Sequence, residues 1–77
     1  MASYSLTIMP GNAKLAADIQ VYLERAVASD TLTIDCTKGG DSLVKEALTV
    51  LSAPQLKKKY QRAAVDNKNR HCVVVIF

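Results

Sequence analysis

Apolar and polar residues alternate in two short segments of the chain. The first segment spans residues 4–9 and places Tyr4, Leu6 and Ile8 on one side, with polar residues between them. The second spans residues 31–36 and alternates in the same way. A period of two is typical of half-buried β-strands, so the pattern predicts a strand in each segment.

An amphipathic helix is predicted after each of these strands, because the apolar residues then recur at helical spacing. The first helix is expected from about Asn12 to Ala28, with Asn12 as its N-cap. The second follows a glycine-rich turn, has Asp41 or Ser42 as its cap, and ends near Pro54. The apolar stripes of the two helices are Leu15, Ile19, Tyr22, Leu23 and Ala26, and then Val44, Ala47, Leu48 and Leu51.

The last third of the chain allows two interpretations. Residues 72–77 are apolar throughout, which indicates a strand that is central in a sheet or covered on both faces. Residues 54–70 form either a helix, or a strand over 60–65 that pairs with 72–77 across a turn at 66–70. Alanine, lysine, glutamine and arginine favour helix over strand, so the helix is the prediction.

These elements predict a single small domain over residues 1–77 of the α/β (α+β) class, in the order β-α-β-α-β. Each helix has one apolar face, so the simplest packing places both helices on one face of a three- or four-stranded sheet. The first two strands are joined by a helix and are therefore expected to be parallel if they are neighbours.

Charge is distributed unevenly along the chain. The segment from Pro54 onward contains six basic side chains and one acidic side chain, Asp66. The part before Pro54 contains four basic and six acidic side chains. A dense basic segment attracts polyanions, so a nucleic acid or an acidic surface is the expected partner. A solvated face that serves only solubility is the alternative.

The sequence lacks the residues that several classes of function require. His71 is the only histidine, so no metal site is expected, and no nucleophile–base set supports an enzyme or a cofactor. Cys36 and Cys72 are expected to be reduced and structural, although a disulfide between neighbouring strands is geometrically allowed. The chain has neither a secretory signal nor a membrane-spanning run, so an intracellular protein, cytoplasmic or nuclear, is predicted.

The segment Lys38–Ala47 resembles a motif of the Alba family of small nucleic-acid-binding proteins, which follows that family's second strand. The matching glycine, small, aliphatic and lysine positions are Gly40, Ser42, Leu43 and Lys45. Asp41 stands where the family is usually basic, and Lys14 stands alone where the family tends to carry a lysine pair.

The resemblance covers about residues 4–52. It implies an intracellular, dimer-prone protein that binds DNA or RNA, with a sheet flanked by two helices and a closing β-hairpin.

Two strand-to-helix turns are the first candidate site. Lys38, Gly39 and Gly40 lie where a strand leads into a helix N-terminus, which favours an anion. With parallel strands, Lys14 in the other turn lies at the same end of the sheet. The alternative is a plain connection that needs glycine for its backbone, with Asp41 adding negative charge there.

The complete predicted interface combines both turns with the basic C-terminal segment. We expect contacts to phosphates rather than to bases, with RNA slightly favoured over DNA because no recognition helix is apparent. Tyr60 is a candidate for base stacking, with a core anchor as its alternative. The second hypothesis is a protein–protein or assembly subunit, including a homodimer through the apolar C-terminal strand. The predicted nucleic-acid-binding residues are Lys14, Lys38, Gly39, Gly40, Lys45, Lys57, Lys58, Lys59, Tyr60, Arg62, Lys68 and Arg70.

Overall fold

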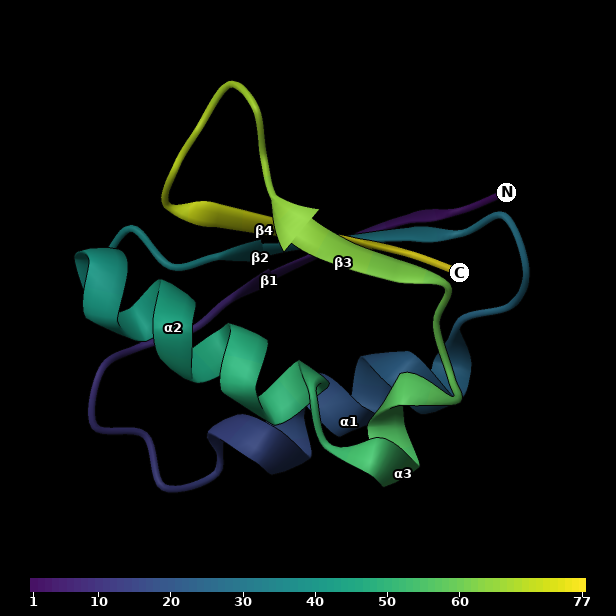
Figure 1. Cartoon of the computed structure of the whole chain (residues 1–77), viewed down its shortest axis with the longest axis horizontal. Coiled ribbons are helices and arrows are strands. Elements are labelled where there is room, and N and C mark those ends of the chain that lie inside the picture. Colours follow the sequence, from purple (N-terminus) through teal and green to yellow (C-terminus); the bar gives the residue numbers. More distant parts are fainter.

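The chain folds into two layers, a four-stranded sheet and a layer of helices packed on one of its faces (Figure 1). The computed structural model describes all 77 residues. This architecture confirms the predicted α/β (α+β) class and the placement of the helices. In chain order the elements are β1 (Ser3–Thr7), α1 (Leu15–Arg25), β2 (Thr31–Asp35), α2 (Gly40–Leu51), α3 (Pro54–Lys57), β3 (Arg62–Val65) and β4 (Cys72–Ile76).

The strands lie in the order β1-β2-β4-β3. β1 and β2 are parallel neighbours, as expected for two strands joined by a helix. β4 lies between β2 and β3 and is antiparallel to both, so both of its edges are hydrogen-bonded. The apolar C-terminal strand is therefore internal in the sheet, which confirms the prediction of a central strand.

The core lies between the sheet and the helices. Ile8, just after β1, and Leu32 and Ile34 of β2 project into this layer and are at most 1% exposed, while the neighbouring strand residues face the open side of the sheet. Each long helix buries one stripe against them, and α3 adds Leu56. The buried helix positions are Leu15, Ile19 and Leu23 in α1 and Leu43, Val44, Ala47 and Leu51 in α2.

The helix predicted over residues 54–70 is wrong, and the hairpin alternative is correct. α3 has four residues, and β3 then pairs with β4, with Ala63 opposite Val75 and Val65 opposite Val73. A continued helix would leave the backbone groups along one edge of β4 without partners, and such groups are costly to bury. Tertiary pairing therefore overrides the local helix propensity of this segment.

The predicted helix ends and caps also need correction. α1 begins at Leu15 and ends at Arg25, so it is shorter than the expected 12–28. Asn12 is not its N-cap, although its side-chain oxygen accepts the Lys14 N–H at 2.9 Å. Neither Asp41 nor Ser42 caps α2, which begins at Gly40 without a side-chain cap.

Tyr60 connects the turn after α3 to the end of α2. Its hydroxyl donates a hydrogen bond to the Leu51 carbonyl oxygen at 2.5 Å, and its ring packs against the core. Burial raises the pKa of this hydroxyl, so it stays protonated as a donor at neutral pH. This hydrogen bond holds the segment between α3 and β3 against the end of α2.

We expect Tyr60→Phe to lower the free energy of unfolding by about 1 kcal/mol, because it leaves the Leu51 carbonyl without its donor. Urea denaturation at neutral pH measures the change. Tyr22→Phe is the matched control, since the Tyr22 ring is also partly buried but its hydroxyl makes no hydrogen bond. Equal losses in the two variants would contradict the role assigned to the Tyr60 hydroxyl.

Candidate nucleic-acid interface

The predicted basic residues separate into two groups at opposite ends of the sheet. The turn end comprises residues 8–18, 35–41 and 66–71, where β1, β2 and β3 end and where α1 and α2 begin. The α3 end comprises residues 24–30, 54–62 and 77. The strands between them have four or five residues, which separates the two ends by roughly 15 Å.

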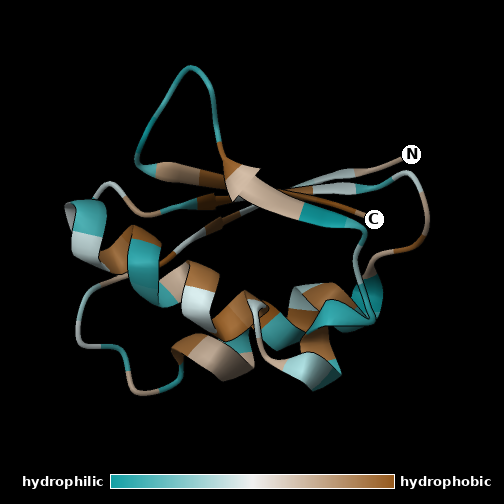
Figure 2. Ribbon diagram, viewed as in Figure 1, coloured by the Kyte–Doolittle hydropathy of each residue, from teal (hydrophilic) through white to brown (hydrophobic).

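Three loops bring four exposed basic side chains to the turn end, namely Lys14, Lys38, Lys68 and Arg70. The expectation that Lys14 and Lys38 lie at one end of the sheet is confirmed by the parallel pairing of β1 and β2. The loop between β3 and β4 rises from the sheet on the side away from the helices (Figure 1), and it is hydrophilic along its length (Figure 2).

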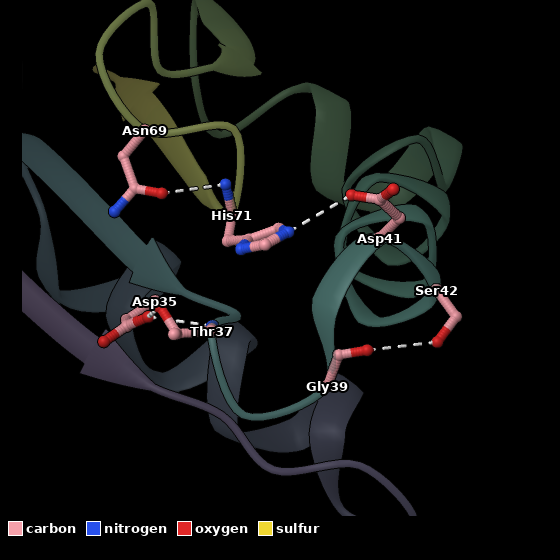
Figure 3. Close-up of polar contacts among 7 residues, drawn as sticks. All are labelled: Asp35, Thr37, Gly39, Asp41, Ser42, Asn69 and His71. Atoms are coloured by element: carbon pink, nitrogen blue, oxygen red, sulfur yellow. Dashed lines mark hydrogen bonds and ion pairs between the residues drawn. The ribbon is translucent and has the colours of Figure 1, made fainter.

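The same end carries an equal number of carboxylates, and most of them organise the turns. Asp35 accepts hydrogen bonds from the hydroxyl and the N–H of Thr37, which lower the pKa of the Asp35 carboxyl (Figure 3). Asp66 accepts the Lys68 N–H at 3.2 Å. The four acidic residues of this end are Asp18, Asp35, Asp41 and Asp66.

His71 joins the β3–β4 loop to the start of α2. Its Nε2 lies 3.3 Å from Oδ1 of Asp41, and the Asn69 side-chain oxygen accepts the His71 N–H at 3.0 Å (Figure 3). The Asp41 carboxylate thus complements the positive end of the α2 dipole. An anion bound at this helix N-terminus would meet a carboxylate already in place.

The two glycines of this turn have structural reasons to be there. A Cβ on Gly39 would lie 2.6 Å from Cβ of Leu43, a buried core residue. Gly40 has a φ of +65°, a backbone conformation that residues with a Cβ adopt only at a cost in conformational energy. These geometries favour the plain connection over a dedicated anion cradle for Gly39 and Gly40.

Gly40→Ala is expected to reduce the free energy of unfolding by roughly 1–2 kcal/mol, because alanine is strained at positive φ. Gly40→Asn should lose less, since asparagine tolerates this conformation better. Urea denaturation of both variants checks the order. If the two variants were equally stable, backbone conformation would not be what requires glycine at this position.

The α3 end holds the unbalanced positive charge of the protein. Five exposed basic side chains lie there, and the only acidic side chains at this end are Glu24 and the buried Asp30. Lys45 belongs to neither end, and the neighbouring Glu46 on the exposed side of α2 balances its charge. Because the turn end is balanced, the whole formal charge of +3 belongs to the α3 end. The five residues are Arg25, Lys57, Lys58, Lys59 and Arg62.

None of these side chains is neutralised by a partner. His71 is the only basic side chain with a carboxylate, that of Asp41, within ion-pair distance, so every lysine and arginine lacks one. Arg25 lies over the ring of Tyr22 at 5.8 Å, and with Lys57 it complements the negative ends of α1 and α3. Lys58, Lys59 and Arg62 have no such structural role.

Arg25 was not among the residues predicted from the sequence, and Tyr60 takes the position given as its alternative, that of a core anchor. Arg25 ends a helix that is distant along the chain from the lysines, and only the tertiary structure brings residues 26–28, just after this helix, next to residues 58–61. A basic residue in the last turn of the first helix was the available signal, although it is common at helix ends. Tyr60 occupies the position of a core anchor, with its hydroxyl committed to Leu51.

Asp30 fixes the turn that leads from α1 into β2 at the α3 end. Its two carboxylate oxygens accept the N–H groups of Val27 at 2.9 Å and Ala2 at 2.8 Å, and Asp30 is 2% exposed. These two hydrogen bonds, that of Val27 foremost, lower the pKa of the Asp30 carboxyl. The charged form therefore stabilises the folded state above the unperturbed pKa of 3.8, and this contribution is lost as the pH falls below it.

We expect Asp30→Asn to lower the melting temperature at neutral pH, because the amide presents an N–H₂ group to one of the two donors. The difference from the parent should narrow as the pH falls below 3.8 toward the lowered pKa of folded Asp30, because protonation removes the contribution of the carboxylate. Thermal unfolding across pH 3 to 7 measures it, with Glu46→Gln as a control for removing an exposed, unpaired carboxylate. A difference that stays constant with pH would contradict the assignment.

No three His, Cys, Asp or Glu side chains gather in a way that would hold a metal ion, and no helix combines the length and apolarity needed to cross a membrane. Cys36 and Cys72 are both free and buried, and burial raises the pKa of the Cys36 thiol to about 11.

No family model, curated protein or solved structure matches the chain.

Proposed function

We propose that this protein is a small nucleic-acid-binding module that contacts phosphates through its α3 end. The carrying observation is the group of five exposed basic side chains there, which have no ion-pair partner and hold the net positive charge. Unpaired lysines and arginines release the counterions of a polyanion when they bind it, so affinity is gained largely through electrostatics. The proposal contains no catalytic step and no cofactor.

The turn end is the weaker candidate for the main contact. Lys14, Lys38, Lys68 and Arg70 lie among four carboxylates, which reduce the attraction of this end for phosphate. The Alba resemblance points to this end, since its motif begins at Lys38, and the terminal hairpin agrees with the ending that the resemblance implies. We therefore assign the turn end secondary contacts to a longer nucleic acid.

RNA or another single strand is expected ahead of duplex DNA. α3 has four residues, so the helix at the basic end is too short to serve as a recognition helix in a major groove. The intracellular location, cytoplasmic or nuclear, remains part of the proposal and agrees with two free cysteines.

A protein–protein or assembly role is the second candidate. β4 has partners on both sides, so the proposed homodimer cannot form by adding a strand to it. The outer strands β1 and β3 and the open face of the sheet remain as routes, and Ile76 is 38% exposed on that face. A concentration-dependent mass in sedimentation, together with no binding of nucleic acid, would favour this role.

The test of the proposed function is fluorescence anisotropy of labelled single-stranded RNA and duplex DNA across a salt series. The triple variant Lys57→Gln, Lys58→Gln, Lys59→Gln should bind single-stranded RNA at least about tenfold more weakly at low salt. Its plot of log affinity against log salt should lose about two units of slope, because each lost phosphate contact on a single strand removes about 0.7.

The matched control is Lys38→Gln, Lys68→Gln, Arg70→Gln, which removes the same charge from the turn end and should have the smaller effect. Failure of the parent to bind either nucleic acid at low salt would overturn the proposal. Parent-like affinity in the α3-end variant would do the same for the assigned surface. A larger loss in the control would move the surface to the turn end.

A further inference from the structure

A shallow hollow lies at the α3 end between the segment that leaves α1 and the segment that enters β3. Its volume is about 230 Å³, and five of its eight lining residues are hydrophobic. Two of the others are Lys58 and Lys59, and no Asp or Glu side chain lines it. The lining residues are Ala26, Val27, Ala28, Lys58, Lys59, Tyr60, Gln61 and Phe77.

Hydrogen bonds hold the walls of this hollow in place. On one side the Val27 N–H is bound by Asp30, and the Ser29 N–H donates to the Phe77 carbonyl at 3.3 Å. On the other side the Gln61 N–H donates to the Ile76 carbonyl at 2.8 Å, and Tyr60 is anchored by its hydroxyl. The hollow is therefore formed before any ligand arrives, which reduces the entropy lost on binding.

The chemistry of the lining selects a ligand that is apolar in its middle and anionic at its edge. Val27 is 65% exposed and offers an apolar surface, while Lys58 and Lys59 contribute two positive charges to the lining. A volume of about 230 Å³ is below the roughly 300–1,000 Å³ of pockets that enclose drug-sized molecules. One nucleobase with its adjoining phosphates matches these properties.

The second hollow of the protein lacks this combination of an apolar lining with cations and no carboxylate. It lies on the open face of the sheet near the β3–β4 loop and has a similar size, about 200 Å³. Its lining pairs a single cation, Arg62, with the carboxylate of Asp66. A phosphate there would meet both charges, so this hollow offers no comparable selection for an anionic ligand.

We infer that the hollow at the α3 end receives one unpaired base of a single-stranded nucleic acid, with Lys58 and Lys59 on the phosphates beside that base. This inference rests on the proposed function. Bases in a duplex are paired and stacked inside the helix, so the hollow distinguishes single strands from duplexes. Lys57 and Arg25 adjoin the lining segments in sequence and would contact the neighbouring phosphates.

The experiment compares two oligomers with the same backbone. One is an oligouridylate of about six nucleotides, within the usual site size for single strands, and the other has the same ribose-phosphate backbone without bases. Anisotropy gives the affinity of each. The parent should prefer the oligouridylate by about tenfold, the order expected when one base gains an apolar platform.

Val27→Asp tests the hollow itself. It places a carboxylate on the apolar lining and should abolish the preference, so that both oligomers bind equally. Val21→Asp is the matched control, because Val21 is a 50% exposed valine on α1 outside the hollow, and it should retain the preference. The readout is the ratio of the affinities for the two oligomers. Repulsion between the added carboxylate and the phosphates weakens the binding of both oligomers alike, so it does not change this ratio.

The outcomes separate the two proposals. If the parent binds both oligomers equally with steep salt dependence, phosphate binding stands and the base site is overturned. A preference that survives in Val27→Asp, or an equal affinity for duplex and single strand, also overturns the base site. If neither oligomer binds at low salt, the proposed function fails and the base site fails with it.

Discussion

The hydrogen-bonding of β4 on both edges is the constraint on which the structure depends. If β4 had one free edge, its backbone donors and acceptors on that edge would lack partners. Residues 62–65 therefore pair with β4 as strand β3. The path back from α2 must then be made by a short α3 and a turn anchored at Tyr60. Because β4 is internal, a partner strand can pair only with the outer strands of the sheet, β1 and β3.

The same topology determines where the charges lie. β3 runs from one end of the sheet to the other, and it therefore separates Lys57–Lys59 from Lys68 and Arg70. The lysines join Arg25 at an end with little acidic charge, whereas the loop residues join Asp35 and its neighbours. A basic run that is continuous in sequence thus becomes one cationic end and one balanced end, with different expected affinities for phosphate.

The first two-thirds of the fold could be predicted because its signals are local. Alternation in residues 4–9 and 31–36 and the helical spacing of Leu15, Ile19 and Leu23 follow directly from the pleat and the helix turn. Helix ends were less predictable, since Asn12 satisfies the Lys14 N–H without being the N-cap. Most basic side chains of the candidate site could be named from the sequence, but their separation between two ends of the sheet could not.

Sequence alone determined the fold class, the apolar faces and the charge excess, because each depends on residue type and on spacing within a few positions. Only the tertiary structure decided that residues 62–65 are a strand, since the gain comes from pairing with β4 and outweighs the helix propensity of Ala63 and Ala64. It also created the hollow between Val27 and Lys58, whose walls come from segments about thirty residues apart. Long-range pairing and packing are not encoded in any short window of the chain, so a site built by them becomes visible only in three dimensions.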